Sequence, residues 1–67
     1  MKNRLKELRA RKGYNQTQLA KLAHVSRQTI SLIERDDFMP SILTAVRIAR
    51  IFNERVEDIF IFEEDEL

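Results

Sequence analysis

Residues 15–35 read NQTQLAKLAHVSRQTISLIER, and this stretch decides the fold because it contains two helix starts 11 residues apart. At the first start, Asn15 is a favourable N-cap and Gln18, three residues later, can complete a capping box. At the second start, Ser26 is the N-cap. The intervening helix has only about two turns, which is too short to be stable alone in water. The stretch therefore predicts two short helices, at about residues 16–23 and 27–35, packed at a fixed angle as in a helix-turn-helix.

Each predicted helix has a hydrophobic residue just before its cap and an apolar side for packing. Tyr14 and Val25 stand at the positions that form hydrophobic staples with the fourth residue of each helix. In the second helix, Ile30 and Ile33 are three residues apart and face inward, so the opposite side is polar. The apolar side of the first helix is expected to consist of Leu19, Ala20, Leu22 and Ala23.

The rest of the chain predicts three further helices around this pair. One runs over about residues 3–12, with Asn3 as a candidate cap and Gly13 as its stop. A second starts at the N-cap Ser41 and ends near Phe52. A third covers about residues 56–60. The residues at helical spacing in the second of these are expected to lie in the core: Ile42, Ala45, Val46, Ala49 and Phe52.

Length and composition indicate a single small globular domain. The chain has 67 residues, of which 43% are hydrophobic and 34% charged, and it has no cysteine. A domain of this size buries about 60% of its unfolded surface. The longest apolar run, residues 59–62, is too short to span a bilayer, and the N-terminal MKNRLK lacks the apolar region of a signal peptide. We therefore expect a cytoplasmic protein.

The net charge of +1 conceals a marked asymmetry along the chain. Residues 1–55 carry all twelve lysines and arginines against five acidic residues, whereas residues 56–67 carry six acidic residues and no basic one. A basic body with an acidic tail favours a polyanionic partner. Solvated charge on a small helical domain explains the same pattern, so charge alone does not decide between them.

Segments 15–35 and 40–60 (PSILTAVRIARIFNERVEDIF) resemble the lambda-repressor-like family of the Cro/repressor, xenobiotic-response-element type. The resemblance extends from about Arg4 to Phe60, and short stand-alone members such as the cytolysin operon repressor are similar in length. It implies an all-α, five-helix DNA-binding domain whose third helix enters the major groove of double-stranded DNA. It also implies that the protein is a transcriptional regulator.

Four positions depart from the pattern of this family. His24 stands where the family has glycine in the turn, which costs on the order of 1 kcal/mol if that residue needs a positive φ. Asp36 and Asp37 replace Gly-Lys and place negative charge where related proteins approach phosphate. Asn53 replaces a C-terminal glycine, and Arg55 replaces a Ser or Thr cap, so the last helix is expected to start less firmly.

The resemblance and the chemistry of the side chains together predict the residues that contact DNA. Arg27 and Gln28 open the second helix of the pair, where arginine can donate two hydrogen bonds to guanine and glutamine can pair with adenine. Ser31 is small enough for close approach, and Leu32 either meets thymine methyl groups or packs. Glu34 is expected to bond within the domain. The candidates for phosphate contact are Gln16, Thr17, Lys21, Thr29 and Arg35.

The sequence contains no plausible catalytic or cofactor-binding constellation. His24 is the only histidine, so it cannot join a Cys/His metal cluster, and a single glycine excludes a glycine-rich phosphate loop. The carboxylates lie mainly in loops and the tail, where solvated charge is expected. We therefore expect no enzyme activity, no cofactor and no metal.

Residues 59–62 (IFIF), directly before four acidic residues, predict a homodimer built through the C-terminal end. The last helix can bury two of them, which leaves Ile61 and Phe62 in a short extended segment that would point to opposite faces. Pairing of two such strands would set the reading helices about 34 Å apart. The alternatives are a monomer that pairs only on DNA, and a protein-interaction module or antitoxin component that keeps the fold.

Overall fold

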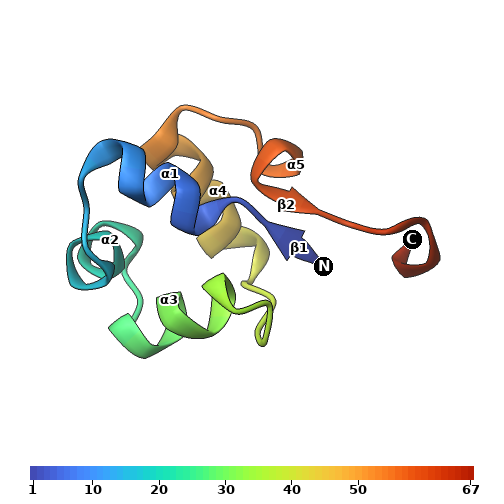
Figure 1. Cartoon of the computed structure of the whole chain (residues 1–67), viewed down its shortest axis with the longest axis horizontal. Coiled ribbons are helices and arrows are strands. Elements are labelled where there is room, and N and C mark those ends of the chain that lie inside the picture. The colour runs from blue at the N-terminus through green and yellow to red at the C-terminus, as the bar shows by residue number, and fades with distance from the viewer.

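Five helices and a two-stranded antiparallel sheet make up the protein (Figure 1). The structure is a computed structural model that describes all 67 residues. It confirms the predicted all-α, five-helix architecture and adds the small sheet. In chain order the elements are β1 (Lys2–Asn3), α1 (Leu5–Lys12), α2 (Gln16–Ala23), α3 (Arg27–Glu34), α4 (Ile42–Phe52), α5 (Val56–Ile59), β2 (Phe60–Ile61) and a 3₁₀ turn (Glu64–Glu66).

The predicted caps of α2, α3 and α4 are all formed. The backbone N–H of Gln18 donates to Asn15 Oδ1 at 2.7 Å, and the N–H of Asn15 donates to Gln18 Oε1 at 2.8 Å, which completes the capping box. Ser26 and Ser41 each accept a hydrogen bond from the third residue of their helices. These bonds satisfy N–H groups that have no partner inside the helix. Local sequence therefore determines where these three helices begin.

Three helices end on a residue in the left-handed conformation. The φ angles are 72° at Gly13, 60° at His24 and 53° at Asn53. The strained turn expected at His24 is thus present, and Asn53 acts as the expected substitute for glycine. Asp36 has the same conformation, with a φ of 61°, in the loop after α3.

The prediction that α1 starts at residue 3 with Asn3 as its cap was wrong. The helix starts at Leu5, and Asn3 lies in β1, paired with Phe60 of β2. Its side chain nevertheless bonds near the helix start, because Asn3 Oδ1 accepts from the Leu5 N–H at 3.0 Å. The pairing joins residues almost 60 positions apart, so local sequence patterns could not reveal it.

Thirteen hydrophobic side chains form one core, but its contribution from α4 differs from the prediction. Ile42 and Val46, expected in the core, are 86% and 37% exposed, whereas Ile48 is completely buried. Leu22, expected on the packed face of α2, is 46% exposed. The helix α4 packs on α2 and α5, and these contacts leave the side that carries Ile42 and Val46 only partly covered. The core consists of Leu5, Leu8, Leu19, Ala20, Ala23, Ile30, Ile33, Ala45, Ile48, Ala49, Phe52, Ile59 and Phe60.

An ion pair between Arg9 and Glu34 joins α1 to the end of α3. Arg9 Nε lies 2.7 Å from Glu34 Oε2, and Arg9 Nη2 donates to Glu34 Oε1 at 3.2 Å. Both side chains are largely buried, at 16% and 5% exposure, and the hydrogen bond to Glu34 raises the pKa of Arg9. Arg9 Nη1 also donates to the carbonyl of Tyr14. The expected internal role of Glu34 is confirmed.

None of the helices combines the length and the apolar character needed to cross a lipid bilayer.

Replacing Glu34 with alanine should destabilise the domain by about 3 kcal/mol, because it leaves the charge of Arg9 partly buried and unpaired. The matched control is Glu7→Ala. Glu7 bridges Arg4 and Arg11 at 2.9 Å each but is 48% exposed, so its loss should cost under about 1 kcal/mol. Urea unfolding followed by circular dichroism measures both. Equal losses in the two variants would contradict the structural role of Glu34.

Candidate nucleic-acid interface

Helix α3 presents a polar side that faces away from the core. At about 100° per residue, Arg27, Gln28, Ser31 and Leu32 fall within an arc of roughly 140°. Ile30 and Ile33 are fully buried on the opposite side. Figure 1 shows α3 along the lower border of the molecule. The four predicted base-contacting residues therefore share one accessible helical surface.

Exposure differs among these four side chains. Arg27 and Gln28 are exposed in the first turn of α3, whereas Ser31 and Leu32 are half-buried. No carboxylate lies within ion-pair distance of Arg27, so its guanidinium keeps its donors for an external acceptor. Leu32 is partly covered by the protein, and only its remaining surface can meet a ligand.

The start of α2 offers hydrogen-bond donors next to this surface. The backbone N–H groups of Gln16 and Thr17 have no acceptor within the chain, as expected for the first turn of a helix. The side-chain amide of Gln16 donates to Glu34 Oε1 at 3.1 Å, which fixes its direction. An amide nitrogen carries two hydrogens, so one remains available. These donors and the helix dipole favour an anion at this position.

The other candidates for phosphate contact differ in how many of their polar groups are already engaged within the chain. The hydroxyl groups of Thr29 and Ser26 lie 2.9 Å apart, so the Thr29 side chain supports the cap of α3. Lys21 is exposed and has no ion-pair partner. Arg35 lies 3.6 Å from Asp37, and both side chains are more than half exposed. Arg35 is thus partly neutralised by the acidic loop that follows α3.

The two acidic residues after α3 differ in their surroundings. Asp36 Oδ1 accepts a hydrogen bond of 2.6 Å from Asn3 Nδ2, and the same nitrogen donates to the carbonyl of Ile33 at 2.7 Å. The Asp36 carboxylate is therefore directed to β1 and the end of α3. Sequence analysis missed this contact because Asn3 was interpreted as a helix cap.

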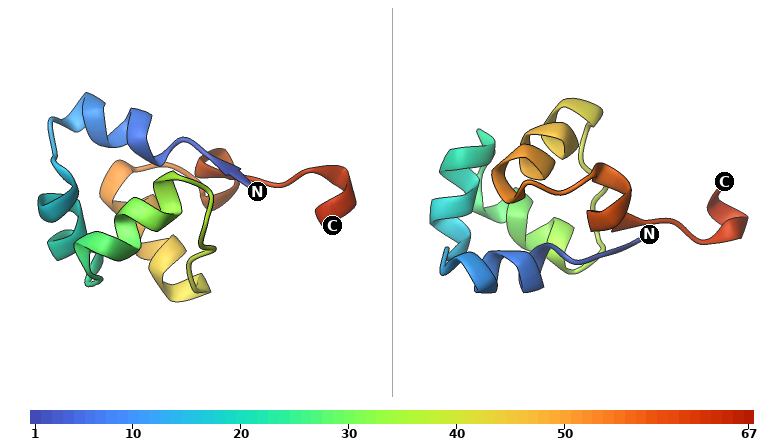
Figure 2. Two further views of the ribbon diagram at one scale, coloured as in Figure 1. Left: turned by 60° about the horizontal axis from the view of Figure 1, so that its bottom comes forward. Right: turned by 90° about the horizontal axis from the view of Figure 1, so that it is seen from above.

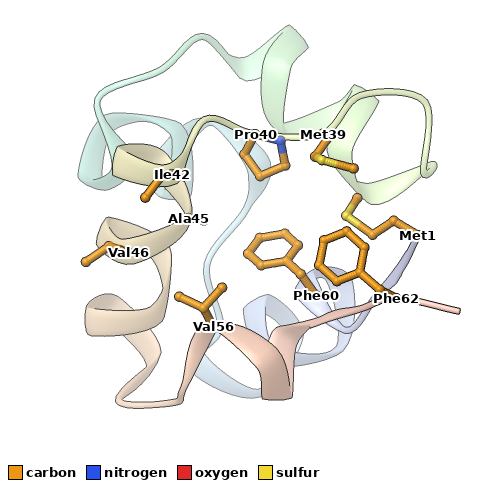
Figure 3. Close-up of a pocket in the computed structure, with 9 residues that line it drawn as sticks. All are labelled: Met1, Met39, Pro40, Ile42, Ala45, Val46, Val56, Phe60 and Phe62. Carbon is orange, nitrogen blue, oxygen red and sulfur yellow. The ribbon is translucent and has the colours of Figure 1, made fainter. Parts of the chain in front are cut away.

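An apolar groove forms a second notable surface. It has a volume of about 240 Å³, and eight of its nine lining residues are hydrophobic. Figure 3 shows Phe60 and Phe62 facing its interior, with Met39 and Pro40 on one side and Val56 on another. Ile61 does not line it and is 43% exposed. The residues lining this apolar groove are Met1, Met39, Pro40, Ile42, Ala45, Val46, Val56, Phe60 and Phe62.

The predicted dimer residues are thus divided between two faces, as expected for a short extended segment. Phe62 lines the apolar groove, and Ile61 lies in β2 opposite Lys2 of β1. Sequence reasoning missed the contribution of α4 to this surface because Ile42 and Val46 had been interpreted as core residues. The sequence did contain a signal for it, because α4 carries more apolar residues than its contacts with neighbouring helices can cover.

Comparison with known proteins identifies the family. The helix-turn-helix family matches residues 5–59. The chain is 48% identical to the uncharacterized HTH-type transcriptional regulator YgzD of Bacillus subtilis, covering 97% of this chain and 98% of that one. It is 50% identical to an uncharacterized HTH-type transcriptional regulator of Methanocaldococcus jannaschii, covering 98% and 100%.

A further relative, an uncharacterized HTH-type transcriptional regulator of Archaeoglobus fulgidus, is 46% identical over all of this chain and 96% of its own length. These similarities include the capped pair α2–α3 and extend through α5. The chain therefore belongs to the Cro/repressor-like helix-turn-helix family.

Proposed function

We propose that the protein is a sequence-specific transcriptional repressor that binds a near-palindromic operator as a homodimer. In this proposal α3 enters the major groove of double-stranded DNA. The observation that carries it is the outward arc of α3, where Arg27 is exposed and unpaired beside Gln28. The names of the relatives, HTH-type transcriptional regulators, support the same function.

Base reading is assigned to the first turn of α3. Arg27 donates two hydrogen bonds to guanine O6 and N7, and Gln28 pairs with adenine N6 and N7. Ser31 is small and permits close approach, while the uncovered part of Leu32 contacts a thymine methyl group. All four side chains lie on the outward side of α3, where they are exposed or half-buried.

Phosphate contacts hold this helix in place. Gln16 and Thr17 donate through the free N–H groups at the start of α2. Gln16 is already oriented by Glu34, so its remaining N–H meets a phosphate without losing side-chain freedom on binding. Lys21 and Arg35 add charge, and Thr29 adds a contact close to the Ser26 cap. The partial neutralisation of Arg35 by Asp37 makes it the weaker of the two charges.

A repressor of this kind needs no catalytic group, because occupying an operator that overlaps a promoter is enough to exclude the polymerase. The homodimer would present two copies of α3 about 34 Å apart, matching successive major grooves on one side of the duplex. Ile61 and Phe62 are the proposed contact residues between the copies, and both are partly exposed.

The alternative is a protein-interaction module, or the antitoxin of a toxin pair, that retains the fold. The acidic residues 36–37 and the acidic tail favour it, because negative charge opposes DNA. A gel shift with the protein's own promoter region separates the two functions. Retarded DNA that survives an excess of nonspecific competitor supports the repressor, whereas no retardation favours the interaction module.

Substitutions on α3 and α2 should have different effects on specific and random DNA. Arg27→Ala and Gln28→Ala should each weaken operator binding by about 1–3 kcal/mol and leave binding to random DNA nearly unchanged. Gln16→Ala should weaken both, because phosphate contacts are independent of sequence. Fluorescence anisotropy with the two DNAs measures these effects. Equal losses on both DNAs for all three variants would show that α3 does not read bases.

Operator binding should depend strongly on salt concentration. If each protomer neutralises about four phosphates, the slope of log K against log[salt] should be near −7 for the dimer, because counterions are released from DNA. Anisotropy titrations between about 50 and 200 mM salt determine this slope. Lys21→Ala should make it less steep, and a slope near zero would refute the DNA-binding proposal.

A further inference from the structure

Several large apolar side chains in or beside the apolar groove are more than half exposed. Ile42 is 86% exposed, Leu43 60% and Met39 55%. Val46 stands one turn after Ile42 on the same side of α4 and lines the groove. A contiguous apolar surface of this kind marks an interaction site more often than a solvated one.

The size and chemistry of the apolar groove fit protein side chains better than a small-molecule ligand. Pockets for small molecules usually have about 300–1,000 Å³ and a few convergent polar groups. The groove has about 240 Å³, and its lining is almost entirely hydrophobic. It can therefore accept one or two apolar side chains but offers little to orient a polar ligand.

The same surface carries both the groove and side chains able to fill one. Ile42 and Met39 line the groove at its border and remain more than half exposed. In a two-fold dimer, a residue of one copy that enters the groove of the other is matched by the reciprocal contact. The surface thus offers both a groove and the apolar side chains that can fill the groove of a second copy.

Unpaired charges of opposite sign next to this surface favour a second copy as its partner. Figures 1 and 2 show the chain after β2 extending away from the helical body, ending in the 3₁₀ turn. Glu64 and Asp65 in this turn have no cation within 4.0 Å. On α4, Arg47 and Arg50 have no carboxylate partner either, and Arg50 continues the row of Ile42 and Val46 at spacings of four residues.

We propose that two copies of this chain pack groove to groove, and that Glu64 and Asp65 of each copy lie on the arginines of the other copy's α4, while Glu66 keeps its 2.6 Å ion pair with the N-terminal amine of its own chain. Ile42 of one copy enters the apolar groove of its partner, and Glu64 and Asp65 pair with Arg47 and Arg50 across the interface. This inference rests on the homodimer proposed above. It keeps Phe62 in the interface through the groove, and it adds the exposed side of α4 and an exchange of the C-terminal tails.

Such an exchange explains the unequal distribution of charge along the chain. The tail would then neutralise two arginines that do not belong to α2 or α3, and its negative charge would be held in the interface. The apolar centre would supply affinity, while the charged rim would select the orientation of the copies.

Analytical ultracentrifugation of the intact protein tests the apolar part. The wild type should be a dimer at micromolar concentration. Val46→Glu should weaken dimerisation at least about 100-fold, because it buries an unpaired carboxylate in both halves of the interface. Lys12→Glu on α1 is the control and should leave the dimer intact. A monomeric wild type, or a Val46→Glu variant that dimerises normally, would overturn the inference.

Charge exchange between the two sites tests the tail. Arg50→Glu alone and Glu64→Arg alone should each weaken dimerisation by about tenfold, because a reversed charge acts twice in a two-fold dimer. The double variant should regain most of the wild-type affinity. Single variants without effect, or a double variant weaker than both, would refute the tail exchange. Circular dichroism verifies that each variant is folded, which is expected because Val46, Arg50 and Glu64 are exposed.

Binding to DNA that contains a single half-site separates this inference from the proposed function. If Val46→Glu is monomeric and still prefers the half-site to random DNA, both proposals stand. If the wild type dimerises through this surface but prefers no DNA sequence, the interface stands and the repressor function fails. If operator binding is specific while Val46→Glu remains dimeric, the repressor function stands and the interface fails.

Discussion

The arrangement of the helix pair depends on the hydrogen bonds that the carboxylate of Glu34 accepts. This carboxylate accepts hydrogen bonds from Arg9 on α1 and from Gln16 at the start of α2, while Arg9 also reaches the carbonyl of Tyr14. The carboxylate thus connects α1, α2 and the last turn of α3, and Arg9 extends the network to the α1–α2 turn. Because α2 and α3 have only eight residues each, neither could hold its orientation without such contacts.

This arrangement links structure directly to the proposed recognition of DNA. The buried side of α3 and the ion pair between Glu34 and Arg9 hold one side of the helix against the core. Arg27 and Gln28 therefore face outward. Gln16 belongs to the same network and also stands at the anion-favouring end of α2. A preoriented donor loses less entropy on binding than a free side chain. In the proposed function, the network therefore contributes to both stability and recognition.

A different part of the molecule is organised by Asn3. Its side chain bonds to Leu5, Ile33 and Asp36, and its backbone belongs to the strand paired with β2. The end of α3 is thereby attached to the sheet that borders the apolar groove. The surface proposed to contact DNA and the surface proposed to contact a second copy are thus linked through the contacts of Asn3.

Local sequence determined the helices and most of their ends. The caps at Asn15, Ser26 and Ser41 were predictable because they depend on bonds between residues three positions apart. The left-handed turn at His24 was also predictable, since helix ends of this kind need a positive φ. The outward position of Arg27 and Gln28 followed from helical periodicity alone.

The tertiary structure decided everything that depends on residues distant in the chain. Helical spacing favoured Ile42 and Val46 as core residues, but the packing of α4 against α2 and α5 buries Ile48 and leaves those two exposed. The strand at Asn3 and the ion pair of Glu34 likewise arise from contacts between residues at least 25 positions apart, and the apolar groove combines residues from both ends of the chain. Periodicity describes one helix at a time, whereas burial depends on which neighbouring elements cover each of its sides.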